Sequence, residues 1–331
     1  MIIYSFKHYL EPVTSFYIGM VVEALQKNGH EVRELDNISK QSLQHCSKDD
    51  WFITTHHKDI VKLWRYGYKN IINWFQGIYP EEDYMMYDSK LRYFAFNLLE
   101  RFNLKHTRIG LFVSKYQIEH YIIKWHNVPK KRHIIPCFNE TLKRDSFYKD
   151  NKYKNNVFCY AGSLYKWQCF NETLAIYKQI EDVYGDVVSL KIFTGDIETA
   201  QNKVADLSIR NCTIAHVPQD QLQMELSNCK YGFIIREDNI VNNVATPTKM
   251  GNYLSNGVIP IITPAVYSFR DIAKEYPHII MLDDIKNLEK IEKSMREEIN
   301  PDNILKEYSD LFDKYYNREK YVKELQYYLS F

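Results

Sequence analysis

Short apolar runs alternate with longer segments of helical periodicity along most of the chain. The apolar runs have lengths typical of buried strands and cover residues 1–6, 31–35, 51–54, 70–74, 109–113, 132–136, 157–161, 189–194, 213–216, 232–235 and 258–263. Helical spacing of apolar positions occupies residues 12–28, 89–103, 115–124, 171–183, 198–205 and 219–227. Strands that alternate with helices predict an α/β fold with parallel sheets.

The longest amphipathic segment spans residues 89–103. It carries an apolar face made of Leu91, Phe94, Leu98, Leu99 and Phe102. The opposite face is polar. The two faces together predict an amphipathic helix.

A charged stretch divides the chain into two halves of similar size. Residues 143–156, LKRDSFYKDNKYKN, are nearly free of aliphatic side chains, which is typical of an interdomain linker. A length of 331 residues also suits two domains. We therefore expect domains at 1–142 and 157–310, each doubly wound, with a helical C-terminal run at 311–331.

One segment of the second half has the features of a phosphate site. The strand 232–235 ends at Arg236, a polar loop follows, and Pro247 occupies the first turn of an expected helix with Thr246 as its N-cap. A helix start offers unpaired N–H groups and a positive dipole end, and Lys249 adds a full charge. We expect phosphate to bind at Thr246, Pro247 and Thr248, opposite Arg236.

This segment resembles the donor-binding region of GT-B glycosyltransferases of the family 4 type. Residues 249–260, KMGNYLSNGVIP, are similar to the family's E-A-x-A-x-G-x-P-V unit and to the P-x-K-x-x-E-Y-L-x-x-G form of bacterial capsule and O-antigen transferases. Asn252 stands where the family has the glutamate that holds the donor ribose. The partner glutamate is replaced near Asn243 and Val244. The resemblance implies that Asn252 contacts the ribose without charge.

A glycine loop after the strand 157–161 strengthens the resemblance. Gly162, Ser163 and Lys166 stand in a stretch similar to the family's G-R-L-x-x-x-K-G loop, whose basic residues grip the diphosphate. Ser163 replaces the arginine, so Lys166 is the better candidate. In the same family the loop at Val217 meets the nucleotide base.

The resemblance implies two Rossmann-like domains that face a cleft, with the final helix crossing back to the first domain. It implies transfer of a sugar from a nucleotide-diphosphate donor to a glycan or lipid-linked acceptor in surface polysaccharide synthesis, with retention at the anomeric carbon and without a metal. Lys166, Arg236 and Lys249 would stabilise the departing diphosphate. The alternative is a sugar- or nucleotide-binding protein of the same fold that has lost turnover, which Asn252 keeps open.

Acceptor chemistry is expected at strand ends of the first domain. His8 and Glu11 follow the first strand, and His56 and His57 follow the strand 51–54. Gln76 and Glu81 belong to QGIYPE, which resembles a Q-G-x-x-P-E stretch of some polysaccharide transferases. Histidine acts as a base near neutral pH, and carboxylates do so when desolvated.

Composition excludes several other classes of protein. The net charge of +1 argues against nucleic acid as a partner. Six cysteines without C-x-x-C spacing indicate neither a disulfide scaffold nor a metal site, and no P-loop or dinucleotide fingerprint occurs. The D-x-D motif of GT-A enzymes has only a poor match at residues 81–83.

The same evidence gives the expected cofactor and location. We expect no cofactor and no metal. Without a membrane-length apolar run or a signal-peptide pattern, the sequence predicts a cytoplasmic protein, and contact with the inner face of the cell membrane stays open.

Overall fold

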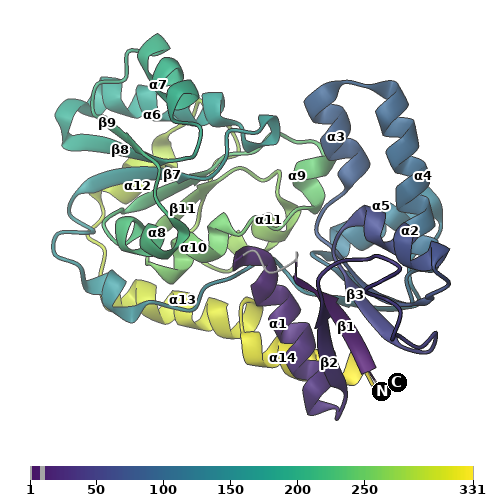
Figure 1. The fold of residues 1–331 in the computed structure, drawn as a ribbon. Helices are drawn as coiled ribbons and strands as arrows, with labels where there is room; N and C mark the ends of the chain where they lie inside the picture. The colour runs from purple at the N-terminus through teal and green to yellow at the C-terminus, as the bar shows by residue number, and fades with distance from the viewer. Residues whose placement is uncertain (1, 8–11, 331) are drawn as a thin grey trace. The chain divides into compact units, whose positions relative to one another are not determined.

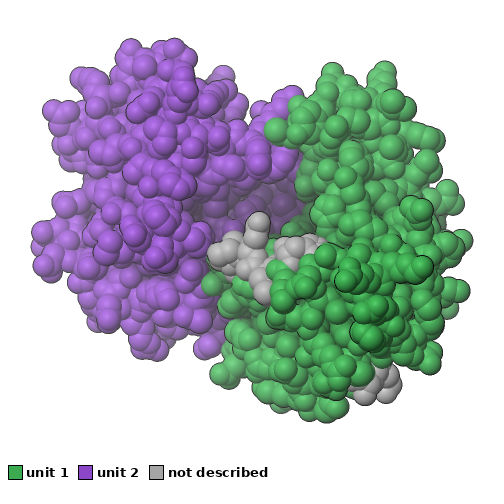
Figure 2. Space-filling view, viewed as in Figure 1, with its two compact units in different colours: residues 1–139, 317–331 green, residues 140–316 purple. Residues whose placement is uncertain are grey.

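The computed structural model describes residues 2–7 and 12–330, which form two compact units (Figure 2). Unit 1 comprises residues 1–139 and 317–331, and unit 2 comprises residues 140–316. Among the described residues, no helix has both the length and the apolar character required to cross a membrane.

Unit 1 is built on a parallel six-stranded sheet, as the alternating pattern predicts. Its strands are β1 (Ile2–Phe6), β2 (Glu31–Leu35), β3 (Trp51–Thr54), β4 (Asn70–Phe75), β5 (Ile109–Phe112) and β6 (Lys131–Ile134), in the order β2-β1-β3-β4-β5-β6. The chain adds β2 on one side of β1 and the remaining strands on the other. The strand order therefore reverses between β1 and β3.

Helices join the strands of unit 1 (Figure 1). They are α1 (Pro12–Lys27), α2 (His57–Arg65), α3 (Tyr79–Tyr87), α4 (Lys90–His106), α5 (Lys115–Trp125) and α14 (Arg318–Tyr328). Helix α14, at the C-terminal end of the chain, belongs to unit 1, as expected. An ion pair of 2.6 Å joins Arg318 to Glu23 of α1, and the Asn28 amide donates to the Gln326 carbonyl at 2.8 Å. The return occurs at Asn317 rather than at residue 311.

Unit 2 contains a second parallel six-stranded sheet. Its strands are β7 (Asn156–Ala161), β8 (Val188–Phe193), β9 (Cys212–Ala215), β10 (Tyr231–Ile234), β11 (Ile259–Ile262) and β12 (Ile280–Met281), in the order β12-β11-β10-β7-β8-β9. The chain runs outward from β7 to β9 and then resumes at β10 beside β7. The carboxyl ends of β7 and β10 therefore flank the topological switch point, where open α/β sheets bind ligands.

The helices of unit 2 include several short ones. They are η2 (Arg144–Tyr148), η3 (Lys166–Gln168), α6 (Phe170–Tyr184), η4 (Gly185–Val187), α7 (Ile197–Asp206), α8 (Gln219–Leu226), α9 (Ile240–Val244), α10 (Lys249–Ser255), α11 (Tyr267–Ala273), α12 (Glu289–Arg296) and α13 (Pro301–Tyr315). Helix α13 belongs to this unit, so the expected division at residue 310 falls inside it.

The charged segment 143–156, expected to be a linker, is part of unit 2. Phe147 is fully buried, and the Tyr153 hydroxyl donates to the Gly257 carbonyl at 2.9 Å. The buried Lys152 amine donates to the carbonyls of Ser227 and Asn256 at 2.9 and 2.8 Å. Buried aromatic rings and one buried amine therefore attach this segment to unit 2. Its high content of charged residues did not indicate these contacts.

Helix α4 exposes much of its apolar stripe and buries several polar side chains. Leu91, Phe94 and Leu98 are 80, 63 and 52% exposed, while Asn97, Glu100 and Asn103 are buried. The other two residues of the apolar stripe, Leu99 and Phe102, are half-buried, so the stripe as a whole is not packed on the core. The side of the helix that faces the protein is polar because it borders a polar cavity, described below.

Candidate functional site

Two cations meet at the switch point of unit 2. Arg236 follows β10, and Lys249 is the first residue of α10. The side-chain oxygen of Gln168, from the loop after β7, accepts from Arg236 Nη2 at 2.5 Å and from Lys249 Nζ at 2.9 Å. Arg236 also donates to the Gln168 carbonyl at 3.0 Å. One neutral amide oxygen thus joins both positive side chains.

Neither cation has a carboxylate partner among the described residues, although both are almost fully buried. Arg236 is 4% exposed and Lys249 is 7% exposed. Burial lowers the pKa of both side chains, and the charge of Arg236 lowers the pKa of Lys249 further. The Lys249 amine also lies 3.9 Å from the centroid of the Tyr160 ring. Buried charge is unfavourable without a counter-charge, so this arrangement is suited to an anion.

Gly162 makes room for Lys249. Its φ of +136° is one that side chains rarely adopt, and a Cβ atom there would lie 2.6 Å from Lys249 Cε. The glycine therefore permits the close approach of a neighbouring lysine to the loop.

The start of α10 differs in detail from the expectation. The α-helix begins at Lys249, and Thr248, not Thr246, is its N-cap residue, without a side-chain capping bond. The Pro247 carbonyl accepts from the Met250 amide at 3.3 Å, a three-residue turn that precedes the regular helix. Pro247 and Thr248 are half-buried beside Lys249.

Asn252 faces the interior of unit 2. It is 7% exposed, and its side-chain oxygen has no hydrogen-bond partner among the described residues. Asn243, in the preceding helix, donates to Asp238 Oδ1 at 2.7 Å and to the Ala265 carbonyl at 3.0 Å. Of the two asparagines near the expected glutamates, only Asn252 keeps an unsatisfied acceptor.

The remaining predicted donor residues are Lys166, Ser163 and Val217, and none of them has a hydrogen bond to Arg236 or Lys249 in the described part of the chain. Lys166 is exposed in η3, with no contact to Arg236 or Lys249 in the described part of the chain. The Ser163 carbonyl accepts from the Tyr160 hydroxyl at 2.6 Å, and Val217 is half-buried after β9. Sequence reasoning missed Gln168, because a lone glutamine two residues after Lys166 belongs to no motif.

Arg236 also borders open space. With Glu237, Arg270 and eleven other residues it lines a cavity of about 480 Å³ at the carboxyl ends of β10 and β11. The Nε atom of Arg236 has no hydrogen-bond partner among the described residues. Arg236 therefore both borders this cavity and keeps a buried donor without a partner in the described chain.

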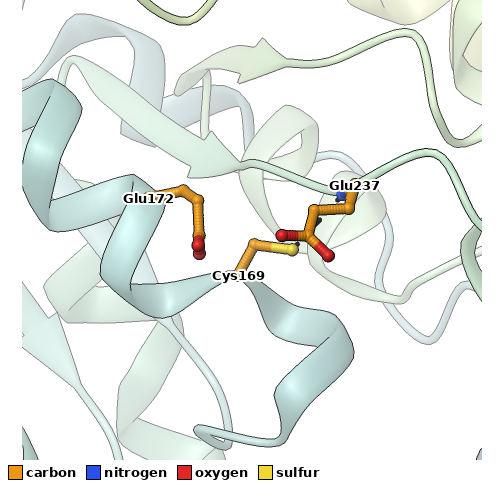
Figure 3. A group of neighbouring side chains, drawn as sticks. All are labelled: Cys169, Glu172 and Glu237. Atoms are coloured by element: carbon orange, nitrogen blue, oxygen red, sulfur yellow. Dashed lines mark hydrogen bonds between the residues drawn. The ribbon is translucent and has the colours of Figure 1, made fainter. Parts of the chain in front are cut away.

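A cysteine and two glutamates gather beside this cavity (Figure 3). The ligand atoms of Cys169, Glu172 and Glu237 lie within 4.8 Å of one another. The Cys169 sulfur accepts from the Glu237 amide at 3.3 Å. Burial raises the pKa of the Cys169 thiol to about 11. Since metals bind the thiolate, a metal at this group would have to displace the thiol proton.

Unit 1 contains a cavity of about 240 Å³ at the carboxyl ends of β3 and β4. The predicted acceptor-side residues His56, His57 and Gln76 line it. Glu81 does not. It pairs with Lys124 at 2.6 Å and lies 3.6 Å from His120. Burial acts to raise the pKa of Glu81, but hydrogen bonds from His120 and Lys124 outweigh it and the pKa is lowered.

Gly77 and Glu82, which adjoin the predicted Gln76 and Glu81, also line the cavity, whereas most of its other residues were not predicted from the sequence. His8 and Glu11, the remaining acceptor-side candidates, lie outside the described residues. The lining includes Trp74, Tyr79, Glu82, Phe96, Glu100 and Asn103. Helix α4 contributes Phe96, Glu100 and Asn103 to the lining. The sequence indicated this contribution only through polar residues at helical spacing.

Comparisons with known proteins identify the fold. No family model and no curated protein matches the chain. Among solved structures, sucrose-phosphate synthase from Thermosynechococcus elongatus matches with a TM-score of 0.70 and 13% identity, covering 98% of this chain and 97% of that one. HepE from Anabaena in complex with UDP and glucose matches with a TM-score of 0.70 and 9% identity over 98% of both chains.

A third solved structure agrees with these two. It is described as trehalose-6-phosphate from E. coli bound with UDP-2-fluoro glucose, and it matches with a TM-score of 0.66 and 8% identity over 98% of this chain and 99% of that one. The predicted fold class is confirmed: the chain is an α/β protein with two parallel sheets and the GT-B fold.

Proposed function

We propose that this chain is a glycosyltransferase that moves a sugar from a nucleotide-diphosphate donor to a glycan or lipid-linked acceptor. The observation that carries the proposal is the buried pair of Arg236 and Lys249 at the switch point of unit 2, which both donate to Gln168 and have no carboxylate partner in the described part of the chain. A diphosphate supplies the negative charge that these two side chains lack. Two structures of the same fold hold UDP or a UDP sugar, which supports UDP as the nucleotide.

The cation pair also suits the chemistry of the departing group. Negative charge develops on the diphosphate as the glycosidic bond to the donor breaks, and fixed positive groups stabilise that charge in a water-poor site. Arg236 and Lys249 supply this stabilisation without a metal. Retention at the anomeric carbon is a separate part of the proposal and follows from the family resemblance. Lys166 would have to approach the diphosphate from an exposed position, so its role rests on the family resemblance.

The second candidate is a nucleotide- or sugar-binding protein of the same fold that has lost turnover. It is favoured by Asn252, which is buried and neutral where the resembled family has a charged ribose ligand. Both candidates bind the nucleotide, so binding does not separate them. Hydrolysis or transfer of a UDP sugar separates the two candidates.

A ligand screen followed by a turnover assay tests the proposal. Thermal unfolding with UDP, GDP, CMP and their sugars should show stabilisation by one of the three nucleotide series, because a ligand that binds only the folded state raises its stability. Release of the nucleotide from the matching sugar would establish the enzyme. Binding without release would favour the second candidate, and no binding would refute both.

A role in surface polysaccharide synthesis, such as capsule or O-antigen, would place the protein in the cytoplasm at the inner face of the cell membrane. Helix α4 supports membrane contact, because its outward positions are apolar or basic: Lys90, Leu91, Arg92, Phe94, Ala95, Leu98, Arg101 and Lys105. Its only acidic residue, Glu100, is buried. An apolar and basic surface is typical of helices that bind anionic lipid.

Sedimentation with vesicles tests this contact. We expect binding to vesicles that contain phosphatidylglycerol, weaker binding to phosphatidylcholine alone, and loss of binding when Phe94 and Leu98 are both replaced by serine. Equal sedimentation of the double variant would refute the assignment of α4 as the membrane contact.

A further inference from the structure

The cavity of unit 1 is surrounded by buried polar atoms that lack partners. Trp74, Glu100 and Asn103 are 3, 7 and 3% exposed, and all three line the cavity. Trp74 Nε1, Glu100 Oε1 and Asn103 Oδ1 have no hydrogen-bond partner among the described residues, and neither has Nε2 of His57. Four such atoms around one cavity are more than a folded core usually tolerates, because each unsatisfied buried group costs about 1–3 kcal/mol.

The unsatisfied atoms have complementary hydrogen-bonding roles. The indole N–H of Trp74 can only donate, whereas the oxygens of Asn103 and Glu100 accept. A hydroxyl group both donates and accepts, so several hydroxyls on one small frame would satisfy this set. A molecule with acceptors alone would leave the two oxygens without partners.

Aromatic rings form one side of the cavity. His57 and Tyr79 stack with their centroids 4.1 Å apart, and Phe96 meets the Tyr79 ring edge-on at 4.6 Å. Burial lowers the pKa of His57 to about 4, so its ring is neutral near pH 7. Flat aromatic surfaces beside polar groups suit a ring with an apolar face and hydroxyl edges.

The charges around the cavity disfavour an anion. No lysine or arginine is among its lining residues, which do include Glu82 and Glu100. Burial raises the pKa of both carboxyl groups. The nearby amine of Lys124 is already held by Glu81 at 2.6 Å and by Glu100 at 2.8 Å. A phosphate here would therefore meet carboxyl groups and no free cation.

We propose that this cavity binds an uncharged, hydroxyl-bearing sugar ring and rejects its phosphorylated form. The assignment of that ring to the acceptor rests on the proposed function; the binding site itself does not. Glu100, Asn103 and Trp74 would form the polar contacts, and His57 and Tyr79 the stacking surface. This reading also explains why α4 turns its polar side inward.

Ligand-observed NMR with saturation transfer tests the proposal on the full chain. The probes are the methyl glycosides of glucose, galactose, mannose and N-acetylglucosamine, with glucose 6-phosphate as the charged counterpart. We expect at least one neutral glycoside to bind and glucose 6-phosphate to bind at least tenfold more weakly. The proposal is overturned if no neutral glycoside binds or if the phosphate binds equally well.

Two variants locate the binding. Trp74→Phe removes the indole N–H, and Asn103→Leu removes the whole amide, including the Nδ2 group that donates to the His57 carbonyl at 2.8 Å. Both keep most of the side-chain volume, and each should weaken glycoside binding at least fivefold. The matched control is Asn97→Leu, a buried position of the same helix that does not line the cavity, which should leave binding within twofold. If one variant fails to fold by circular dichroism, the other decides; unchanged affinity in a folded variant contradicts the site.

Titration with UDP separates this proposal from the proposed function. If UDP binds the protein and no glycoside does, only the cavity assignment fails. If a glycoside binds as described and no nucleotide does, the cavity stands and the glycosyltransferase proposal fails.

Discussion

The candidate sites of the two units differ in their chemistry. Both sheets are parallel and six-stranded, and both carry their candidate site at carboxyl strand ends. At the candidate site of unit 2 the buried ionic groups are Arg236 and Lys249, without a carboxylate partner in the described chain. In unit 1 the cavity is lined by Glu82 and Glu100, without a lysine or arginine.

This difference teaches that the fold supplies the position of a site and the side chains supply its ligand. Uncompensated cations suit a diphosphate, whereas carboxyl and amide groups beside aromatic rings suit an uncharged sugar. A donor and an acceptor that differ in charge could thus be distinguished by two similar domains. Each prediction below tests one side of this contrast.

The largest effect is expected from Lys249→Ala. It removes a charge-assisted contact to the diphosphate, and the loss in nucleotide affinity should be about 1.5–3 kcal/mol by calorimetry. Lys230→Met is the matched control: this lysine is 1% exposed but precedes β10, at the other end of the sheet. Equal nucleotide affinity for wild type and Lys249→Ala would contradict the assignment of Lys249 to a diphosphate site in unit 2.

Gly162→Ala should weaken nucleotide binding by displacing Lys249. The new Cβ would lie 2.6 Å from Lys249 Cε, and backbone strain of this kind costs about 1–3 kcal/mol of stability. Gly185→Ala is the control, because its φ is +58° and its Cβ would meet nothing within 4 Å. We expect both variants to lower Tm and only Gly162→Ala to lower affinity. Equal affinities in the two variants would contradict the role of Gly162.

His57 should make unit 1 sensitive to acid. Its pKa is about 4 in the folded protein and about 6.5 when unfolded, so the unfolded state binds more protons between these values. Stability should therefore fall as pH decreases from 6.5 to 4, by about 1 kcal/mol at pH 5 after allowance for partial exposure. The slope of Tm against pH should be shallower in His57→Gln than in the wild type.

The exposed His45 provides the control for this titration. His45→Gln should keep the wild-type slope. If His57→Gln keeps it as well, the ring of His57 is not a buried neutral group and the stacking surface of the cavity loses one member.

A smaller effect is expected at Asn252. Asn252→Ala should lower nucleotide affinity by about 0.5–1.5 kcal/mol, and Asn252→Glu should raise it if the ribose binds there, since a charged hydrogen bond is about twice as strong. Asn228→Ala, an exposed position before β10, is the control. If calorimetry gives the same affinity for both Asn252 variants and the wild type, Asn252 does not contact the nucleotide.

Removal of metals should have no effect on turnover. The cation pair supplies the positive charge that a metal supplies elsewhere, so transfer rates should be equal with and without EDTA. The group Cys169, Glu172 and Glu237 gives a sharper version of this test. A rate lost in EDTA, restored by Mn²⁺ or Mg²⁺ and abolished in Glu237→Gln would show that a metal does bind there.

The sequence by itself determined the fold class and most of the strands. Apolar runs bounded by polar residues are local signals, and they placed β3 at 51–54 and β7 near 157–161 within a residue or two of the structure. The strand end located Arg236, the helix start located Lys249, and the glycine turn located Gly162; the structure brings the three together. These features could be read because each depends on residues close in sequence.

Only the tertiary structure decided which side chains are buried and which distant residues they contact. The sequence indicated that α4 has an apolar and a polar face. Only the structure shows that Leu91, Phe94 and Leu98 are exposed and that Asn97, Glu100 and Asn103 are buried. Periodicity finds the two sides of a helix but not which side meets the protein, because that depends on the partners packed against it. Gln168 was invisible for the same reason: its importance comes from two cations that lie 68 and 81 residues away along the chain.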